Sequence, residues 1–405
     1  MRAYKVGGAV RDRLLGRVPR DADYVVVGAT PAAMLAEGYK QVGADFPVFL
    51  HPETKEEYAL ARTERKRGRG HKGFAVDAAP TVTLEEDLMR RDFTVNAMAE
   101  EDDGRLIDPH QGRRDISLRR LRHVSEAFAE DPLRVLRAAR FAAELDFIID
   151  GATEKLMAEM VAAGALAELA PERIWMELRR GLASLRPRRM FECLRACGAL
   201  AAVLPEVDAL FGVEQDPKQH PEGCAGTHTM MVLTAAAANS WPWEYRWAAL
   251  LHDVGKALTP AADLPRHPGH EERGAELAAA ACARLRVPKK AAAGATVATR
   301  EHGLVHGFAE LEPEDATALL GRAGAWRTAG QLECLLAVCD CDHSAHPDLP
   351  DVYQIHPQRE LIEACVAAVA ELDLADVASK GEGAKAEADA RRRAAVAKTM
   401  AEWRG

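Results

Sequence analysis

Hydrophobic and polar positions follow two different patterns along the chain. In the first part, short apolar runs bounded by glycine, proline or aspartate predict strands at 24–27, 46–50 and 58–61. From about residue 130 onward, apolar residues recur at three- and four-residue spacing in stretches rich in Ala, Leu, Glu and Arg, which predicts helices. We therefore expect an α+β fold, with a mixed-sheet head followed by all-α regions.

Prolines and a polar linker divide the helical part. Segment 215–226 is rich in Pro, Gly and Lys, as is typical of a linker. The charged residues from Ser379 onward predict either a helix or a disordered tail. The sequence thus predicts four parts: a head at 1–123, a helical neck and body at 124–215, a second helical domain at 216–378 and a tail at 379–405.

Composition excludes several classes of protein. The 405 residues are 48% apolar and 28% charged, which is ordinary for a folded protein. No apolar run approaches the roughly 20 residues that cross a bilayer, and the charged residues 11–13 interrupt any signal-peptide core, so a soluble cytoplasmic protein is expected. The eight cysteines include no CxxC pair. Cys334, Cys339 and Cys341 are interpreted as buried helix thiols rather than as a metal site.

Charge is distributed unevenly. The net charge of −9 excludes a protein held to nucleic acid by bulk charge. Segment 62–73 nevertheless opposes six cations to Glu64 alone, which predicts a mobile basic loop suited to a polyanion, with a solvated charged turn as the alternative. The cations are Arg62, Arg65, Lys66, Arg67, Arg69 and Lys72.

A glycine turn and a pair of aspartates follow one another near the N-terminus. A strand pattern leads into a turn at Gly8 and a short helix with Arg11, where backbone N–H groups and a guanidinium can bind phosphate. Asp21 and Asp23 come next, and two residues apart on a strand they project from the same face. Paired carboxylates are ligands that Mg²⁺ prefers. The alternative to a phosphate-binding site at Gly8 is a plain tight turn, and the alternative to a metal-binding pair is a polar entrance to the strand.

Arginines recur in two later segments. Arg91 lies in the sequence Arg-Arg-Asp-Phe-Thr-Val-Asn-Ala. Further on, Glu-Asp-Pro-Leu-Arg opens a helix in which Arg134, Arg137 and Arg140 form an oblique stripe on one side. Taken alone, such a stripe is equally compatible with a salt-bridged surface.

The order of these motifs resembles that of the class II tRNA nucleotidyltransferases, the CCA-adding enzymes, over most of the chain. The resemblance implies a polymerase-β-like head that adds and repairs the 3′-terminal CCA of tRNA from CTP and ATP without a nucleic-acid template, in a monomer or homodimer. It implies that Asp21 and Asp23 are the catalytic carboxylates and hold Mg²⁺, with Glu57 as one option for a third ligand. Positions that bind nucleotide in such enzymes match Gly8, Arg11, Arg91, Asp131, Arg134, Arg137 and Arg140. Among these, Asp131 and Arg134 match the pair that reads the base edge.

A second group of motifs resembles the HD phosphohydrolases. His228 lies near the start of one predicted helix, and the pair His252 and Asp253 ends another. The resemblance implies one divalent metal, Ni²⁺ or another, and phosphatase, 2′,3′-cyclic phosphodiesterase and 2′-nucleotidase activities. The implied ligands are His228, His252, Asp253 and a distal aspartate, for which Asp342 is favoured and Asp340 is the alternative.

Four further histidines lie near this group. His302 and His306 are spaced to share a helix face, but they are interpreted as ordinary polar residues because no further ligand accompanies them. His267 and His270 lie a few residues after the His-Asp pair.

Three alternative functions are weighed. A class II poly(A) polymerase shares the head motifs, but the acidic charge balance and the HD region argue against it. An HD phosphohydrolase with a nucleotide-sensing head is disfavoured because a sensor needs no complete metal pair. A non-catalytic tRNA-binding protein is the third, and it predicts that Asp21→Ala leaves function unchanged.

Overall fold

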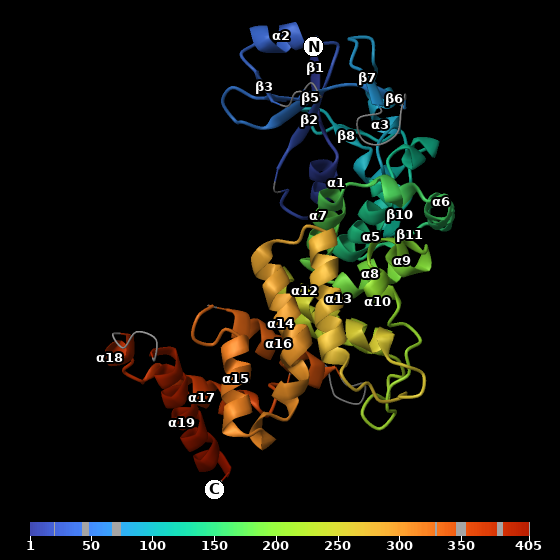
Figure 1. The fold of residues 1–405 in the computed structure, drawn as a ribbon. Coiled ribbons are helices and arrows are strands. Elements are labelled where there is room, and N and C mark those ends of the chain that lie inside the picture. The colour runs from blue at the N-terminus through green and yellow to red at the C-terminus, as the bar shows by residue number, and fades with distance from the viewer. Residues whose placement is uncertain are drawn as a thin grey trace. The chain divides into compact units, whose positions relative to one another are not determined.

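The chain folds into two compact units in the computed structural model, which describes residues 1–19, 21–42, 48–66, 74–328, 330–345, 354–378 and 384–404. The first unit comprises Met1–Glu177 and Arg189–Ala202, and the second comprises Leu178–Arg188 and Val203–Gly405 (Figure 1). The four-part division expected from the sequence stays a prediction.

A mixed sheet forms the centre of the N-terminal region. Its strand order is β3-β4-β5-β2-β1-β8-β9, in which β2 and β5 run parallel and the other neighbours antiparallel. The strands are β1 (Arg2–Val6), β2 (Asp23–Val27), β3 (Lys40–Val42), β4 (Val48–Leu50), β5 (Glu57–Leu60), β8 (Ala99–Glu100) and β9 (Leu106–Ile107). The three predicted strands are present as β2, β4 and β5, although β5 ends at Leu60, one residue earlier than predicted. Residues 46 and 47 of the second predicted strand lie outside the described part.

Part of the predicted basic loop is a strand instead. β6 (Thr63–Lys66) pairs with β7 (Phe74–Asp77) in antiparallel register, so the prediction of a loop was wrong for 63–66. A strand of mostly charged residues has no apolar face in its sequence, so the pattern of apolar positions does not indicate it. The partner strand also lies several residues away. Residues 67–73 lie outside the described part of the chain.

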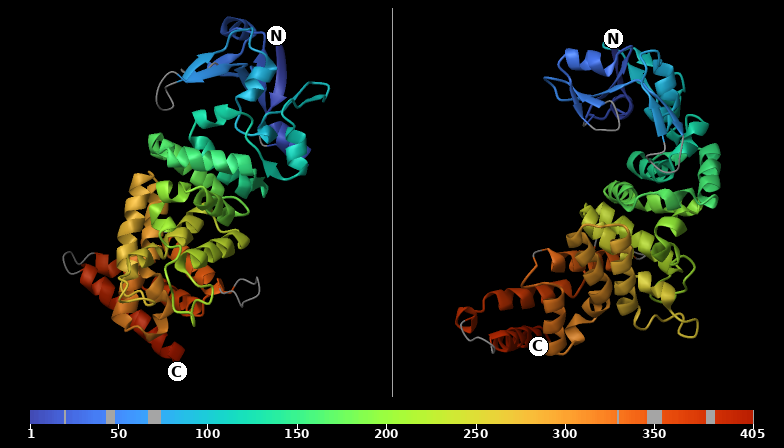
Figure 2. Two further views of the ribbon diagram at one scale, coloured as in Figure 1. Left: turned by 90° about the vertical axis from the view of Figure 1, so that its right-hand side faces the viewer. Right: turned by 45° about the horizontal axis from the view of Figure 1, so that its top comes forward.

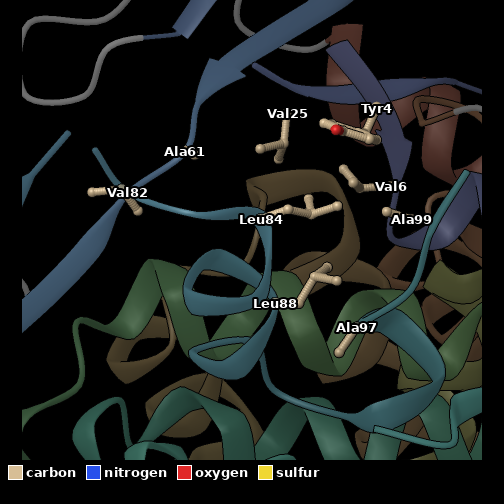
Figure 3. Packing of buried hydrophobic residues seen from close by; sticks show 9 residues of the cluster. All are labelled: Tyr4, Val6, Val25, Ala61, Val82, Leu84, Leu88, Ala97 and Ala99. Atoms are coloured by element: carbon tan, nitrogen blue, oxygen red, sulfur yellow. The ribbon is translucent and has the colours of Figure 1, made fainter. Parts of the chain in front are cut away.

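The alternating apolar positions of β2 pack on opposite faces of the sheet. Val25 joins a cluster with Val6 and with Leu84 and Leu88 of α3 (Leu84–Met89), as Figure 3 shows. Val26 contributes to the other face, where the cluster contains Met34, Phe49 and Leu60. Each such side chain contributes about 1.5–3 kcal/mol when fully buried, so both faces fix β2 and thereby the position of Asp23 at its start.

Helices follow the sheet in the first unit and continue across the division. Four of the helices given below begin at a proline, which suits the first helical turn, so a proline can start a helix as well as end the preceding one. Residues 120–121 (β10) and 148–149 (β11) form a two-residue parallel pair. The helices are α1 (Gly8–Leu14), α2 (Pro31–Ala36), α4 (Gly112–Ser117), α5 (Leu133–Leu145), α6 (Gly151–Ala162), α7 (Pro171–Leu182), α8 (Pro187–Ala196), α9 (Ala199–Val203) and α10 (Pro205–Asp208). Short 3-10 helices are η2 (Thr94–Asn96), η3 (Glu126–Glu130) and η4 (Ala165–Glu168).

Among the described residues, every helix or strand assigned in the rest of the second unit is a helix. Helices α12 (Trp243–Leu251), α14 (Lys289–His306) and α16 (Gln331–Ser344) pack on one another (Figure 2), and Trp247 of α12 is fully buried. The predicted tail forms a helix, α19, that packs on α15 and α17. The elements are α11 (Ala225–Ala238), α12 (Trp243–Leu251), η5 (Val254–Leu258), α13 (His270–Arg284), α14 (Lys289–His306), η6 (Phe308–Glu310), α15 (Pro313–Arg322), α16 (Gln331–Ser344), α17 (Arg359–Ala370), α18 (Ala375–Ala378) and α19 (Ala384–Arg404).

The helices bear on two expectations from the sequence, namely buried cysteine thiols and no segment that crosses a membrane. Cys334, Cys339 and Cys341 are buried in α16, and none belongs to a potential metal-binding group among the described residues. Burial raises the pKa of the Cys334 thiol to about 12, so this thiol is protonated at neutral pH. Over the described ranges, no helix is both long and apolar enough to cross a membrane.

Candidate active sites in the head and the HD region

The first candidate site is built around the start of β2. Asp23 pairs with Val6 of β1 on one side and with Glu57 of β5 on the other, which brings the suggested third carboxylate next to it. Asp21 precedes the strand, so the prediction that both aspartates lie on one strand was wrong, although the Asp21 carboxylate still affects the pKa of Asp23. The reason is that β1 ends at Val6, opposite Asp23, and leaves no partner for Asp21.

A cavity of about 210 Å³ lies at this edge of the sheet. Its charged lining residues are Asp23, Glu57, Arg62, Asp87, Arg90 and Arg91. Desolvation raises the pKa of Asp23, the Arg91 guanidinium opposes this shift and the Asp21 carboxylate adds to it. A carboxylate under these conditions gains from a nearby cation, and the oxygen-only donors fit Mg²⁺.

The glycine turn lies beside Arg91. Gly7 has a φ of 70°, and a Cβ atom there would lie 3.0 Å from Arg91 Nη1, so glycine permits both the turn and the close approach. Arg91 donates to Asp87 Oδ2 at 3.2 and 3.3 Å and to the Asn96 carbonyl at 3.4 Å. Gly8 is the first residue of α1, directly after this turn.

A buried hydrogen-bonded chain connects Arg11 of α1 to Arg137 of α5. Arg11 Nη1 donates to Asn96 Oδ1 at 2.7 Å, and Asn96 Nδ2 donates to Asp92 Oδ1 at 3.1 Å. Arg137 donates to Asp92 Oδ2 from Nε at 2.8 Å and from Nη2 at 2.6 Å. Burial raises the pKa of Asp92, but Arg137 and Asn96 overcome this and lower it to about 2. Asp92 and Asn96 belong to the arginine-containing motif, but no role was predicted for them.

The remaining nucleotide-binding candidates lie on or beside α5. Asp131 Oδ2 accepts from Arg173 at 2.8 Å, and Asp131 Oδ1 accepts from the Leu133 backbone at 3.1 Å. Arg134 donates to the carbonyls of Ala127 and Arg90 at 2.6 and 2.7 Å. These contacts fix the orientation of both side chains.

Arg140 has surroundings unlike those of its neighbours. Its side chain is fully buried, donates to Glu177 and Glu144, and lies 3.9 Å from the centre of the Phe141 ring. The three arginines of α5 therefore do not form one exposed stripe. In this conformation Arg140 supports its neighbours rather than presenting a surface to ligand.

The second candidate site unites residues of α11, α16 and the turn that follows α12 in the second unit. His228 of α11 has its Nε2 2.7 Å from Asp342 Oδ1 of α16. Nitrogen and oxygen atoms of His228, His252 and Asp342 all lie within 4.8 Å of one another. Asp253 is the next residue after His252, and its Oδ2 lies 3.3 Å from His252 Nε2. The structure thus brings the four favoured ligands together.

Asp340 is directed elsewhere. Its Oδ1 accepts from the His356 backbone at 2.8 Å, and its Oδ2 pairs with Arg359 Nη1 at 2.6 Å. Asp342 instead contacts His228 and His306, the latter at 2.9 Å. The geometry favours Asp342 over Asp340, as expected from their angular separation on one helix.

Contacts at Nδ1, the ring nitrogen that points away from the site, orient the imidazoles of His228 and His252. His228 Nδ1 lies 2.8 Å from Glu222 Oε1, and His252 Nδ1 donates to the Ala249 carbonyl at 2.7 Å. Both rings therefore present Nε2 to the site. Burial lowers the pKa of His228, but hydrogen bonds to Asp342 and Glu222 outweigh burial and raise it to about 9.

The donor set suits a divalent metal. His252 Nε2 and both oxygens of Asp253 are buried and have no hydrogen-bond partner among the described residues, although Lys256 forms an ion pair with Oδ2 at 2.6 Å. Imidazole and carboxylate together fit Ni²⁺, Mn²⁺ or Zn²⁺. The sequence interpretation missed Glu222, and it set His302 and His306 aside although both lie at this group. The spacing of His302 and His306 was the available signal.

Three segments match known families. Residues 3–122 match the poly A polymerase head domain, residues 146–211 match the probable RNA and SrmB-binding site of polymerase A, and residues 225–344 match the HD domain. The fold and both sites thus define a nucleotidyltransferase with a metal-dependent HD phosphohydrolase domain. The predicted fold class, a mixed-sheet nucleotidyltransferase head followed by helical regions and an HD domain, is confirmed.

Relatives identify the family. The multifunctional CCA protein of Aromatoleum aromaticum is 53% identical over 379 residues, which cover 93% of each chain. That of Halorhodospira halophila is 57% identical over 345 residues, or 84% of this chain and 83% of the relative. The chain belongs to the multifunctional CCA proteins and is a CCA-adding tRNA nucleotidyltransferase with an HD domain.

A solved structure agrees with this assignment. The crystal structure of the Bacillus stearothermophilus CCA-adding enzyme in complex with CTP is 27% identical in sequence. It superposes with a TM-score of 0.63 over 97% of this chain and 88% of its own.

Proposed function

We propose that the head adds and repairs the 3′-terminal CCA of tRNA without a nucleic-acid template, with Asp21 and Asp23 as catalytic carboxylates that hold Mg²⁺. One observation carries this assignment: Asp23 and Glu57 lie in adjacent positions of parallel strands and line one cavity with Arg91. When bound, Mg²⁺ favours deprotonation of the tRNA 3′-hydroxyl and neutralises the leaving pyrophosphate. The 3′-oxygen forms its bond to the α-phosphorus as the bond to pyrophosphate breaks.

Residues around the glycine turn would bind the triphosphate. Gly8 offers backbone close to the ligand, and Arg91 lies at the cavity with its plane fixed by Asp87. Arg11 is 8% exposed and held by Asn96, which preorganises its guanidinium beside the turn. Arg137 is held by Asp92, which also accepts from Asn96, so Arg137 belongs to the same hydrogen-bonded chain as Arg11. Arg140 positions α5 through its ion pair with Glu177.

Asp131 and Arg134 would select the base. A carboxylate accepts from the exocyclic amine of C or A, and a guanidinium donates to the neighbouring ring acceptor. Each carboxylate oxygen has two lone pairs, so Asp131 can remain paired with Arg173 while it binds a base. The contacts of Arg134 with two carbonyls hold its plane for this task.

The HD domain would hydrolyse phosphoesters at RNA ends, as phosphatase, 2′,3′-cyclic phosphodiesterase and 2′-nucleotidase. The support is the convergence of His228, His252, Asp253 and Asp342, and Ni²⁺ is the proposed metal. A monomeric or homodimeric state and a cytoplasmic location stay predictions.

Addition to a truncated tRNA tests the proposal. The substrate ends at the discriminator base and is supplied with CTP alone, ATP alone or both. We expect two additions with CTP and a third only when ATP is also present. ATP tailing without CTP would instead indicate a poly(A) polymerase, and no addition at all would contradict the assignment of the head.

A further inference from the structure

A cavity of about 260 Å³ lies between three helices of the second unit, apart from the HD group. It is lined by the N-terminal parts of α12, α14 and α16. On or directly after each helix, a residue at the HD group follows a cavity residue by eight positions: His252 follows Glu244, His302 follows Gly294 and Asp342 follows Cys334. Eight residues of helix rise about 12 Å, so the cavity is a separate site at the other end of these helices.

The inner wall of the cavity is apolar and made of small residues. Ala291 is 4% exposed and Cys334 is 3% exposed. A Cβ atom on Gly294 would meet only Cys334 within 4 Å outside its own helix backbone, at 3.4 Å from Sγ, so the space in front of Gly294 is open. Burial raises the pKa of the Cys334 thiol to about 12, and the thiol is therefore a neutral part of this wall.

Two opposite charges line the same cavity without pairing. Among the described residues, the side chains of Glu244 and Lys290 form no hydrogen bond and no ion pair, either with each other or with a third group. Lys290 is exposed and Glu244 is half-buried. Because the two charges stay apart, both are available to a ligand that carries the complementary charges at one end.

The volume limits the size of the occupant. An apolar cavity of about 150 Å³ holds one benzene molecule, so this cavity has about 110 Å³ more than a single ring needs. The additional space suits a polar head group next to an apolar body. Pockets for drug-sized ligands begin at about 300 Å³, which argues against a nucleotide or an RNA end at this site.

We propose that this cavity binds a small zwitterion with an apolar body, which is the chemistry of a free amino acid with a hydrocarbon side chain. The hydrocarbon packs on the wall of Ala291, Gly294 and Cys334. The ammonium group pairs with Glu244 and the carboxylate pairs with Lys290. Neither the nucleotidyl transfer nor the phosphoester hydrolysis proposed above uses this site.

Binding of L-phenylalanine to the full-length protein tests the proposal. A titration followed through the nuclear magnetic resonance signals of the probe gives its Kd. We expect one saturable site with a Kd in the millimolar range, because ion pairs at an exposed rim contribute little. Phenethylamine lacks the carboxylate and 3-phenylpropionate lacks the ammonium group, so each should bind about threefold more weakly.

Three variants locate the binding site. Gly294→Leu fills the cavity and should abolish saturable binding. Glu244→Gln should weaken binding of phenylalanine about threefold and leave that of 3-phenylpropionate unchanged, whereas Lys290→Gln should weaken phenylalanine equally and leave phenethylamine unchanged. The matched control is Lys289→Gln, because Lys289 is exposed on the same helix but does not line the cavity. This control should keep the wild-type Kd.

Several results would overturn the proposal. They are the absence of saturable binding to the wild type, equal affinities for the three probes, and unchanged binding in Gly294→Leu. Circular dichroism shows whether each variant folds, and the two charge variants keep the test decisive if Gly294→Leu does not. None of these measurements requires turnover, so failure of the proposed nucleotide addition or phosphoester hydrolysis would leave them unaffected.

Discussion

Asp340 and Asp342 lie two residues apart on α16, yet their side chains serve different ends. Asp340 is 1% exposed and held by Arg359 and the His356 backbone, whereas Asp342 contacts two histidines. The sequence predicted that only one of them binds metal, because two helical positions diverge by about 200°. Which one does depends on neighbours that lie 16 to 114 residues away in the sequence, and the sequence alone does not place them.

Substituting these two aspartates should have opposite effects. Asp342→Asn should reduce metal-dependent phosphohydrolase activity at least about 100-fold because it removes an anionic ligand. Asp340→Asn should retain most activity but lower stability by about 1–3 kcal/mol, since Arg359 loses a buried charged partner. Phosphatase assays with Ni²⁺ and thermal unfolding measure both effects. Equal losses of activity would contradict the assignment of Asp342.

Asp92 makes part of the stability of the head dependent on pH. Its pKa of about 2 in the folded protein lies below its ordinary value of 3.8, so its stabilisation is present above pH 3.8 and is lost as the pH falls through 2. The full contribution is about 2 kcal/mol. In urea unfolding followed by circular dichroism, the difference between wild type and Asp92→Asn should narrow by about 1 kcal/mol between pH 5 and pH 3. A difference that is constant with pH would show that Asp92 is not the titrating group.

At the scale of elements, two backbones meet without side chains between them. A Cβ atom on Gly255 of η5 would lie 1.9 Å from the His270 carbonyl and 2.6 Å from the Gly274 backbone nitrogen. Because η5 follows Asp253 and α13 begins at His270, this contact sets the position of the proposed ligand Asp253 relative to α13. The sequence pattern Leu-Leu-His-Asp-Val-Gly-Lys predicted the end of a helix here but not this packing.

Gly255→Ala should therefore damage both stability and metal binding. The overlap is with backbone atoms that no rotamer change relieves, so we expect a loss of about 3 kcal/mol in the second unit. The matched control is Gly321→Ala in α15, where the Cβ atom would make an ordinary 3.5 Å contact with Trp326. The free energy of unfolding of this control variant should be unchanged or rise by up to about 1 kcal/mol, because alanine favours a helix more than glycine does. Thermal unfolding compares the two, and similar melting temperatures would contradict the close contact.

Elements with a strong pattern were predictable, and short ones were not. The apolar run of β2 and the three-residue spacing of α5 identify them in the sequence. The pair of β10 and β11 has two residues per strand, too few for any period, and depends on tertiary packing. The same holds for β6, whose partner lies beyond the basic segment.

For the whole molecule, motif order identified both activities, but contacts decided the details of each site. Motifs as far apart as His228 and Asp342 carry the HD resemblance, and the structure brings them within 2.7 Å. His302 lies outside that motif, and its spacing in the sequence identified no partner for it. The fold places Asp253 beside it. Arg140 matched a nucleotide-binding position, whereas its complete burial became visible only through Glu177 and Phe141.

Two sites built from separate residues predict that the two activities separate by mutation. Asp21→Ala should abolish incorporation of CTP and ATP while phosphoester hydrolysis stays at the wild-type rate, because no ligand of the HD group belongs to the head. Asp253→Ala should abolish hydrolysis and spare incorporation. Both rates are measured on the same preparations, with truncated tRNA for addition and a 2′,3′-cyclic nucleotide for hydrolysis. Loss of both activities in either variant would mean that the sites depend on each other, whereas full incorporation by Asp21→Ala would remove the head carboxylate from the mechanism.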